Sequence, residues 1–186
     1  MESRCEELVD EVLNNVNTVQ YLWRAVNDLR DSPLMRESVK CVQNDAVAAG
    51  YMWRSVGALR KGDISLSVRK HQTSQDVERS LRHELVHAFD DARGVVDPND
   101  CLHVACSEVR AARLSGDCFF ANGSRNLDMF SGGAQCVKQR AIVAVENVSL
   151  CRDFGPRSVE MAFKRCYKDY EPFASPVYYM GSFTKE

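Results

Sequence analysis

The sequence lacks any uninterrupted apolar run close to the ~20 residues that a membrane-spanning helix needs, so we expect no segment to cross a bilayer. It also lacks an excess of positive charge, since 24 Lys and Arg face 26 Asp and Glu, for a formal charge of −2. We therefore do not expect nucleic acid among its partners, because surfaces that bind nucleic acid are basic. The cysteines form no C-x-x-C pair, which argues against a zinc ribbon or a thioredoxin-type motif.

The first residues also lack two common targeting patterns. The chain begins Met-Glu-Ser-Arg-Cys-Glu-Glu, which is neither a basic segment followed by an apolar one nor an Arg-rich, acid-poor stretch. We therefore expect no secretory signal and no mitochondrial presequence.

Cysteine, by contrast, is abundant: the chain has eight, spread along its whole length. An even number fits a disulfide framework, and ordinary buried thiols in a reducing compartment are the alternative. The sequence alone does not fix which cysteines would pair.

Length and composition indicate one globular domain, with 186 residues, 45% hydrophobic and 27% charged. Apolar residues recur at helical spacing over 8–26, and a second helix is expected between Pro33 and Gly50, so 1–50 is predicted as N-terminal helices. Alternation over 64–68 predicts a half-buried strand, and its expected partner lies within 51–59.

The rest of the chain is predicted to be mostly helical. Thr73 or Ser74 is expected to cap the helix that follows the strand, and Pro156 suits a first helical position. We thus predict a single domain over 1–186 of the α+β class, mainly helical, with a small sheet beside one helix. Its predicted segments are N-terminal helices over 1–50, the sheet over 51–70, two helices over 73–116, an irregular stretch over 117–133, two helices over 134–170 and an irregular tail over 171–186.

One segment, His83-Glu84-Leu85-Val86-His87, carries chemistry. Histidines four residues apart lie about 40° apart on one face of a helix, so both imidazoles can reach a single Zn²⁺. Glu84 is then placed to take a proton from the water that the zinc activates and to pass it to the leaving amine of a peptide. A match of this length also arises by chance, but here it lies on a helix predicted independently of it.

A catalytic zinc needs a third protein ligand, and Glu108 is the candidate. It shares one helical stripe with small residues, where a buried carboxylate is costly unless it is paired, and a metal ion is one such partner. An ion pair with Arg110 or Arg113, or exposure to water, is the alternative for this carboxylate.

Two rivals for the third ligand are His103 and Asp90. His103 lies five residues before Glu108, about 140° away on a helix, so the two are not expected to face one metal. Asp90 follows His87 by three residues, and we interpret it as a group that orients a histidine.

The strand over 64–68 lies just upstream of this helix. Metallopeptidases of this kind place there the edge strand that pairs with an extended substrate, because unpaired backbone groups suit backbone recognition. The expected substrate is therefore a peptide segment in extended form.

From His83 to Cys118 the chain reads HELVHAFDDARGVVDPNDCLHVACSEVRAARLSGDC. This stretch resembles the family of mitochondrial inner-membrane metalloproteases that assist ATP synthase assembly, whose pattern is H-E-L-x-H-A-x-D followed by H-x-A-C-S-E-x-R-A-A-x-L-S-G-D-C. Weaker similarity continues over 136–140 and 166–173, so the resemblance covers about half of the chain. The matched positions are His83, Glu84, Leu85, His87, Ala88, Asp90, His103, Ala105, Cys106, Ser107, Glu108, Arg110, Ala111, Ala112, Leu114, Ser115, Gly116, Asp117 and Cys118.

The resemblance implies a zincin-like fold and a zinc metalloendopeptidase of the mitochondrial intermembrane space, peripheral on the inner membrane. It implies a hydrolase that removes the N-terminal extension of an ATP synthase membrane-sector subunit, or acts on another inner-membrane or intermembrane-space protein, and that assists assembly of this sector. It also implies disulfide-bonded cysteines, one catalytic Zn²⁺, His83 and His87 as zinc ligands, and Glu84 as the catalytic residue.

The chain departs from the family in the sheet region. Gly57 and Gly62 stand apart where relatives commonly carry a Gly-Gly stretch, and Ser65 and Ser67 lie in the strand where relatives carry a cysteine. We therefore expect one family disulfide to be absent or paired differently, and a less secure docking edge for the substrate.

Two other functions remain open. The chain is alternatively a non-proteolytic assembly chaperone with a structural or idle zinc site, although a structural site does not need Glu84. The third possibility is a cytosolic metallopeptidase with reduced cysteines. Candidates for the transition-state stabiliser are His103, Tyr167 and Tyr170, and an exposed apolar face on the first or last helix is a candidate for docking on a membrane.

Overall fold

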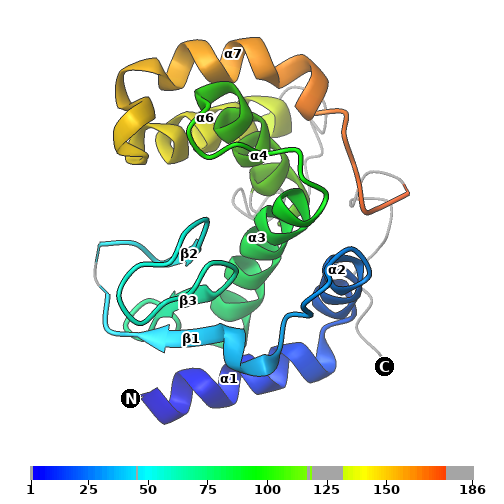
Figure 1. Cartoon of the computed structure of the whole chain (residues 1–186), viewed down its shortest axis with the longest axis vertical. Helices are drawn as coiled ribbons and strands as arrows, with labels where there is room; N and C mark the ends of the chain where they lie inside the picture. The colour runs from blue at the N-terminus through cyan, green and yellow to red at the C-terminus, as the bar shows by residue number, and fades with distance from the viewer. Residues whose placement is uncertain (1, 45, 117, 119–131, 175–186) are drawn as a thin grey trace. The chain divides into compact units, whose positions relative to one another are not determined.

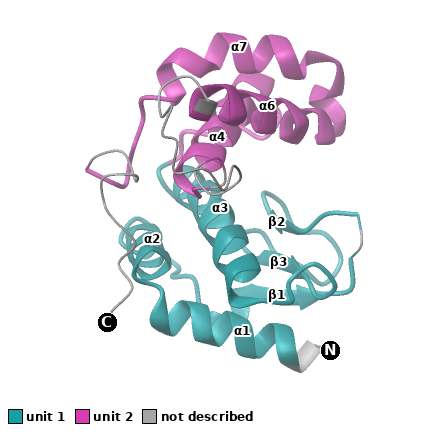
Figure 2. Cartoon of the chain, turned by 180° about the vertical axis from the view of Figure 1, so that it is seen from behind, with its two compact units in different colours: residues 1–93, 182–186 teal, residues 94–181 magenta. Residues whose placement is uncertain are grey.

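The computed structural model describes residues 2–44, 46–116, 118 and 132–174. These residues fall into two compact units, one ending at Arg93 and the other beginning at Gly94 (Figure 2). The fold is α+β and mainly helical, with one small sheet, as the sequence predicted. Among the described helices, none combines the length and the apolar character needed to cross a membrane.

The first unit begins with two helices, where the sequence predicted one. They are α1 (Glu2–Asn15) and α2 (Asn17–Asn27), separated by Val16 in an extended conformation. The Gln20 side chain donates hydrogen bonds to the carbonyls of Leu13 and Asn14 at the end of α1. The break escaped prediction because the apolar spacing continues through it: Val12, Val19 and Val26 are all buried.

The predicted helix between Pro33 and Gly50 is wrong. A short 3-10 helix, η1 (Arg36–Ser38), leads into strand β1 (Val39–Val42), and β2 (Ala49–Tyr51) follows, so the sheet starts well before residue 51. β-branched residues at both ends of Val39–Val42 favour a strand. Cys41 is joined to Cys5 of α1 by a disulfide, a long-range constraint that no local pattern reveals.

The strand predicted over 64–68 is confirmed as β3 (Ile64–Ser67), but its expected position at the sheet edge is wrong. The strand order is β1-β3-β2, with β3 parallel to β1 and antiparallel to β2. The backbone of β3 is therefore paired on both sides, and every residue of this strand is buried. The edges of the sheet are β1 and β2.

The partner predicted over 51–59 is also shorter than expected. β2 ends at Tyr51, and the loop after it folds back through a single bridge between Val56 and Leu59 around Gly57, whose φ is +58°. Backbone bonds from Met52 to Asp63 and from Gly62 to Met52 close the base of this loop.

The sheet and both N-terminal helices pack on α3 (Ser74–Ala92) (Figure 1). Of the two residues predicted as the cap, Thr73 and Ser74, the structure selects Thr73. The Thr73 hydroxyl accepts a hydrogen bond from the Asp76 N–H at 3.2 Å, and the Asp76 carboxylate accepts one from the Thr73 N–H at 3.1 Å. This reciprocal pair satisfies two backbone donors that the first helical turn leaves open. Leu81, Leu85 and Val86 are fully buried in the core of this unit.

The second unit is helical. It contains α4 (Cys101–Leu114), α6 (Gly132–Asn147), the 3-10 helix η2 (Ser149–Phe154) and α7 (Gly155–Cys166), with Pro156 in the first turn of α7 as predicted. Three disulfides lie in this unit, and with Cys5–Cys41 they pair all eight cysteines. The three are Cys101–Cys151, Cys106–Cys166 and Cys118–Cys136.

Most of the predicted irregular stretch over 117–133, and the tail beyond residue 174, lie outside the described residues. The core of the second unit is formed by buried side chains of α4, α6, η2 and α7, which are Val104, Ala105, Val109, Ala112, Val137, Ala141, Val145, Cys151, Val159 and Cys166.

Candidate metal centre

The motif histidines lie on α3, which is held between the sheet and the N-terminal helices. The ring centroids of His83 and His87 are 4.9 Å apart and the rings are inclined by 75°. His87 is 5% exposed, and His83 is half-buried. The helix therefore does what the spacing predicted, and brings two imidazoles side by side.

Glu84 follows His83 on the same helix and is 6% exposed. A buried carboxylate is costly unless it is compensated by hydrogen bonds or by a nearby positive charge. It occupies the position that the H-E-x-x-H pattern gives to a general base.

An aromatic ring from a distant part of the sequence contacts His87, and no sequence pattern predicts this contact. The Trp53 ring meets the His87 ring edge to face, with centroids 5.9 Å apart and an interplanar angle of 62°. Trp53 also packs edge to face on Tyr51, at 5.1 Å and 86°. Trp53 lies in the loop after β2, and no periodic pattern links a loop tryptophan with a helical histidine.

Tyr51 is in turn fixed to the end of α3. Its hydroxyl donates to Asp91 Oδ2 at 2.6 Å, and Lys61 Nζ lies 3.3 Å from Asp91 Oδ1. Burial, followed by the bond to Asp91, raises the pKa of Tyr51 well above its ordinary value, so this hydroxyl keeps its proton. Asp91 of α3 thus binds both ends of the loop that carries Trp53, through a hydrogen bond from Tyr51 and an ion pair with Lys61.

Asp90 and His103, the rival ligands, have other surroundings. Asp90 is fully buried on α3. Its Oδ1 accepts two hydrogen bonds from the Arg93 guanidinium, one from Nε at 3.2 Å and one from a terminal nitrogen at 2.9 Å. His103 is exposed on α4, and its Nδ1 accepts a hydrogen bond from the backbone N–H of Asp97 at 3.1 Å.

Glu108 is half-buried on α4, the helix capped by Asp100. Of the two arginines considered as its partners, Arg110 is buried and forms an ion pair with Asp169. The guanidinium carbon of Arg113 lies 3.8 Å from the ring centroid of Tyr167 and 4.4 Å from that of Tyr170. Each arginine therefore has a partner of its own at the carboxyl end of the second unit.

Two of the candidate stabilisers take part in that arrangement. The Tyr170 hydroxyl accepts a hydrogen bond from Arg113 at 3.3 Å, and the Tyr167 ring stacks on Phe163 with centroids 4.9 Å apart. A hydroxyl that accepts from arginine still has its own proton to donate, so Tyr170 keeps the chemistry that a stabiliser needs.

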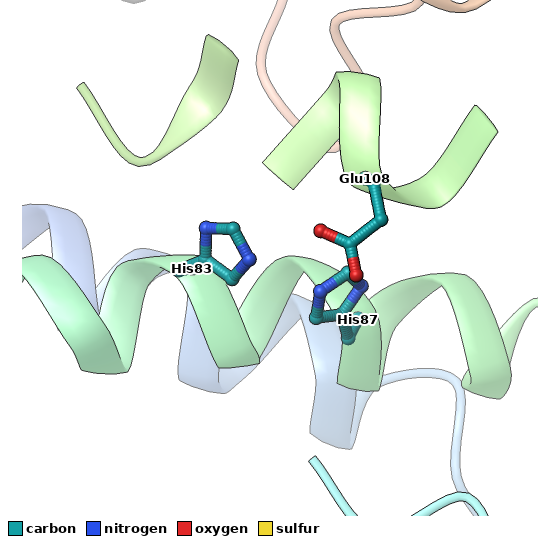
Figure 3. A group of neighbouring side chains, drawn as sticks. All are labelled: His83, His87 and Glu108. Atoms are coloured by element: carbon teal, nitrogen blue, oxygen red, sulfur yellow. The ribbon is translucent and has the colours of Figure 1, made fainter. Parts of the chain in front are cut away.

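Among the described residues, the side chains that could together hold a metal ion form one group, His83, His87 and Glu108, each offering one ligand atom (Figure 3). Neither Asp90 nor His103 belongs to it. Two imidazoles and a carboxylate make a donor set that zinc accepts in catalytic sites.

H-E-x-x-H on a helix is the pattern by which metallopeptidases bring two histidines and a general base together. The comparison with protein families agrees with this class. The model of the Peptidase M76 family matches residues 3–174, and the chain belongs to this family.

Three relatives show how far the similarity extends. The Xenopus laevis protein named "Mitochondrial inner membrane protease ATP23 homolog" is 45% identical over 112 residues, which make up 55% of this chain and 45% of that protein. The Schizosaccharomyces pombe protein named "Mitochondrial inner membrane protease atp23" is 30% identical over 174 residues, or 91% of this chain and 90% of that protein. The Mycosarcoma maydis protein named "Mitochondrial inner membrane protease ATP23" is 29% identical over 194 residues, or 91% of this chain and 89% of that protein.

The match thus spans less than half of the frog relative but most of the two fungal ones. No solved structure matches the chain.

Proposed function

We propose that this chain is a zinc metalloendopeptidase in which His83 and His87 bind one catalytic Zn²⁺, Glu108 is the third ligand and Glu84 is the catalytic base. The observation that carries the proposal is the pair of imidazoles, whose ring centroids are 4.9 Å apart on a helix that also carries the buried Glu84. Membership of a peptidase family makes a protein or peptide the expected substrate.

The chemistry divides between the metal and the chain. Zinc, when bound, supplies a Lewis acid that lowers the pKa of a coordinated water to about 7. Glu84 accepts a proton from the attacking water and delivers it to the leaving amine. His87 is oriented by Trp53, so the contact between these two rings helps to fix the direction of one zinc ligand.

The substrate segment is expected to pair with the edge of β2 rather than with β3. β3 is paired on both sides, whereas β2 pairs only with β3 among the described residues. The last residue of β2, Tyr51, is hydrogen-bonded to Asp91 of α3. Addition of an extended peptide to a strand edge supplies backbone hydrogen bonds that do not depend on side-chain sequence.

The cellular setting is proposed from the relatives and from the disulfides. Two fungal relatives that match most of this chain are named mitochondrial inner membrane proteases, and four disulfides suit an oxidising compartment. The proposal places the protein in the intermembrane space, peripheral on the inner membrane. There it processes the N-terminal extension of an ATP synthase membrane-sector subunit and assists its assembly.

The first experiment separates an enzyme from a non-proteolytic assembly factor. Glu84→Gln should retain zinc and lose cleavage, by a factor of about 10²–10⁴ in kcat, because the variant removes the base and leaves the ligands. Zinc content and cleavage of a peptide substrate are measured on the same preparation. Full cleavage by Glu84→Gln contradicts the assigned role, and full support of every cellular role by this variant favours the assembly function.

The third ligand is tested with a matched pair on one helix. Glu108→Ala should weaken zinc binding more than His103→Ala, because His103 is exposed and its Nδ1 is bonded to the Asp97 backbone. Competition with a chelator gives both affinities, and the opposite order overturns the assignment of Glu108.

The compartment is tested by counting thiols in the denatured protein without reductant. The intermembrane-space assignment predicts none that are free, because all eight cysteines are paired. A count near eight in protein isolated from cells would favour the cytosolic reading.

A further inference from the structure

The last helix of the second unit has one buried side and one side that faces solvent. Gly155, Ser158, Val159 and Cys166 are its buried residues. Phe154, at its N-cap, is 53% exposed, and Met161 is 61% exposed. Large apolar side chains this exposed need a physical explanation when they share one helix face.

Basic residues occupy the same solvent-facing side. Positions 154, 157, 161 and 164 are separated by three or four residues, so Phe154, Arg157, Met161 and Lys164 lie along one stripe of the helix. Arg157, Lys164 and Arg165 are all exposed. Leu150, in the 3-10 helix that leads into α7, is a further large apolar side chain that is exposed, at 55%. We call Leu150, Phe154, Arg157, Met161, Lys164 and Arg165 the α7 face.

The charge of this segment is opposite to that of the whole chain. Residues 150–168 contain five basic and two acidic side chains, a net charge of +3, whereas the chain carries −2. Of the two acids, Glu160 is already paired with Lys138 of α6. A local positive charge around exposed apolar side chains is the composition of a helix that lies in the interface of an anionic bilayer.

We propose that the α7 face is the surface by which the protein docks on an anionic lipid bilayer, with Phe154 and Met161 entering the interface and Arg157, Lys164 and Arg165 meeting the lipid phosphates. This inference rests on the proposed peripheral location and specifies how it is achieved. Basic side chains near an anionic bilayer strengthen binding by about fivefold each at low ionic strength, so three of them act together with the apolar anchors.

The test uses the whole oxidised chain and two kinds of vesicle, phosphatidylcholine alone and phosphatidylcholine mixed with phosphatidylglycerol. In a flotation assay the parent should bind the mixed vesicles and lose binding as salt is raised. Arg157→Gln with Lys164→Gln should reduce binding to the mixed vesicles by about 25-fold, from about fivefold per charge removed. Phe154→Ser with Met161→Ser should also reduce it.

Matched controls lie in the first unit. Met35 has the same exposed fraction as Met161, 61%, so Met35→Ser tests for a general effect of losing an exposed methionine. Arg24→Gln with Arg60→Gln removes two exposed charges of the first unit. Both controls should bind like the parent. Circular dichroism establishes that each variant is folded, and all the substituted side chains are exposed.

Two outcomes overturn the proposal. The first is a folded parent that does not bind the mixed vesicles. In that case a protein partner becomes the alternative occupant of the α7 face. The second is a loss of binding as large in the control variants as in the α7 variants. The assay does not depend on catalysis, so a failure of the peptidase proposal, seen in zinc content and cleavage, remains distinct from a failure of this one.

Discussion

The two units of the chain differ in what stabilises each of them. The unit that ends at Arg93 combines three helices and a sheet around fully buried aliphatic residues, and it contains one disulfide, Cys5–Cys41. The unit that begins at Gly94 is helical and contains three disulfides. The helix with the two histidines therefore depends mainly on packing for its stability, and the helix with Glu108 depends on cross-links that only an oxidising environment forms.

The sharpest way to test this difference is to remove one cross-link from the second unit. Cys106–Cys166 closes a loop with a sequence separation of 60, for which the chain-entropy model gives about 4 kcal/mol. Cys106→Ser with Cys166→Ser should lower the free energy of unfolding of the second unit by that amount. Amide hydrogen exchange, followed residue by residue, reports the loss.

The expected loss of protection is confined to α4, α6 and α7, since both sulfurs lie in this unit. Equal loss of protection in α3 would contradict the division between the two units. The double variant should also keep its other three disulfides, which mass spectrometry under non-reducing conditions can check.

The converse test targets packing in the first unit. Leu85 lies between Glu84 and the second motif histidine and is fully buried. Leu85→Ala should cost about 3 kcal/mol in the free energy of unfolding, from lost transfer energy and the cavity left behind. Urea unfolding measures this cost, and hydrogen exchange should place it in α3. Leu85→Met is the control, since it keeps the volume and should cost about 1 kcal/mol.

A smaller effect, on zinc affinity, is expected when the Trp53 ring that contacts His87 is removed. Trp53→Ala should weaken zinc binding by about tenfold, because contacts that orient a metal ligand typically contribute tenfold or more to affinity. Trp53→Phe keeps an aromatic ring against the imidazole and should recover most of the loss. Chelator competition measures both affinities. If the two variants lose the same affinity, the edge-to-face contact is not what positions His87.

The smallest expected effect is on the free energy of unfolding, when the cap at the start of the histidine helix is removed. Thr73→Ala should cost about 1 kcal/mol at neutral pH, because it removes the cap from the first turn of α3. Hydrogen bonds from Thr73 lower the pKa of Asp76 below its ordinary value of 3.8, so the ionised carboxylate stabilises the folded state. This contribution is present above about pH 3.8 and is lost as pH falls through the lower folded value.

Urea unfolding of the parent and of Thr73→Ala as a function of pH checks this last prediction. The difference between the two should shrink as Asp76 becomes protonated in acid. A difference that grows on acidification would have the wrong sign for a carboxylate stabilised by its cap.

The histidine helix could be predicted from sequence because its signals are local. The Thr73 cap, the apolar period and the H-E-x-x-H spacing all lie within one segment, and the structure confirms the helix and its cap. The strand over Val39–Val42 could not be predicted in this way. Its partners are β3 and Cys5, both distant in sequence, and the local apolar spacing also fitted a helix.

The site shows the same contrast. The two histidines of the site are neighbours on one helix face, so their spacing in the sequence predicts their geometry. Trp53 reaches His87 from a loop whose path is fixed by Tyr51 and Lys61 at Asp91, and none of these contacts has a periodic signal. The position of β3 in the middle of the sheet likewise depends on β1, the strand that sequence reasoning missed.

Metal analysis of the purified protein is the simplest test of whether His83 and His87 bind a zinc ion. Zinc is measured by elemental analysis in the purified, oxidised parent, in His83→Ala and in His103→Ala, each shown to be folded. We expect one zinc per chain in the parent and in His103→Ala, and none in His83→Ala. If the folded parent takes up no zinc when the metal is supplied, or if His83→Ala keeps its zinc in full, these histidines do not form a zinc site.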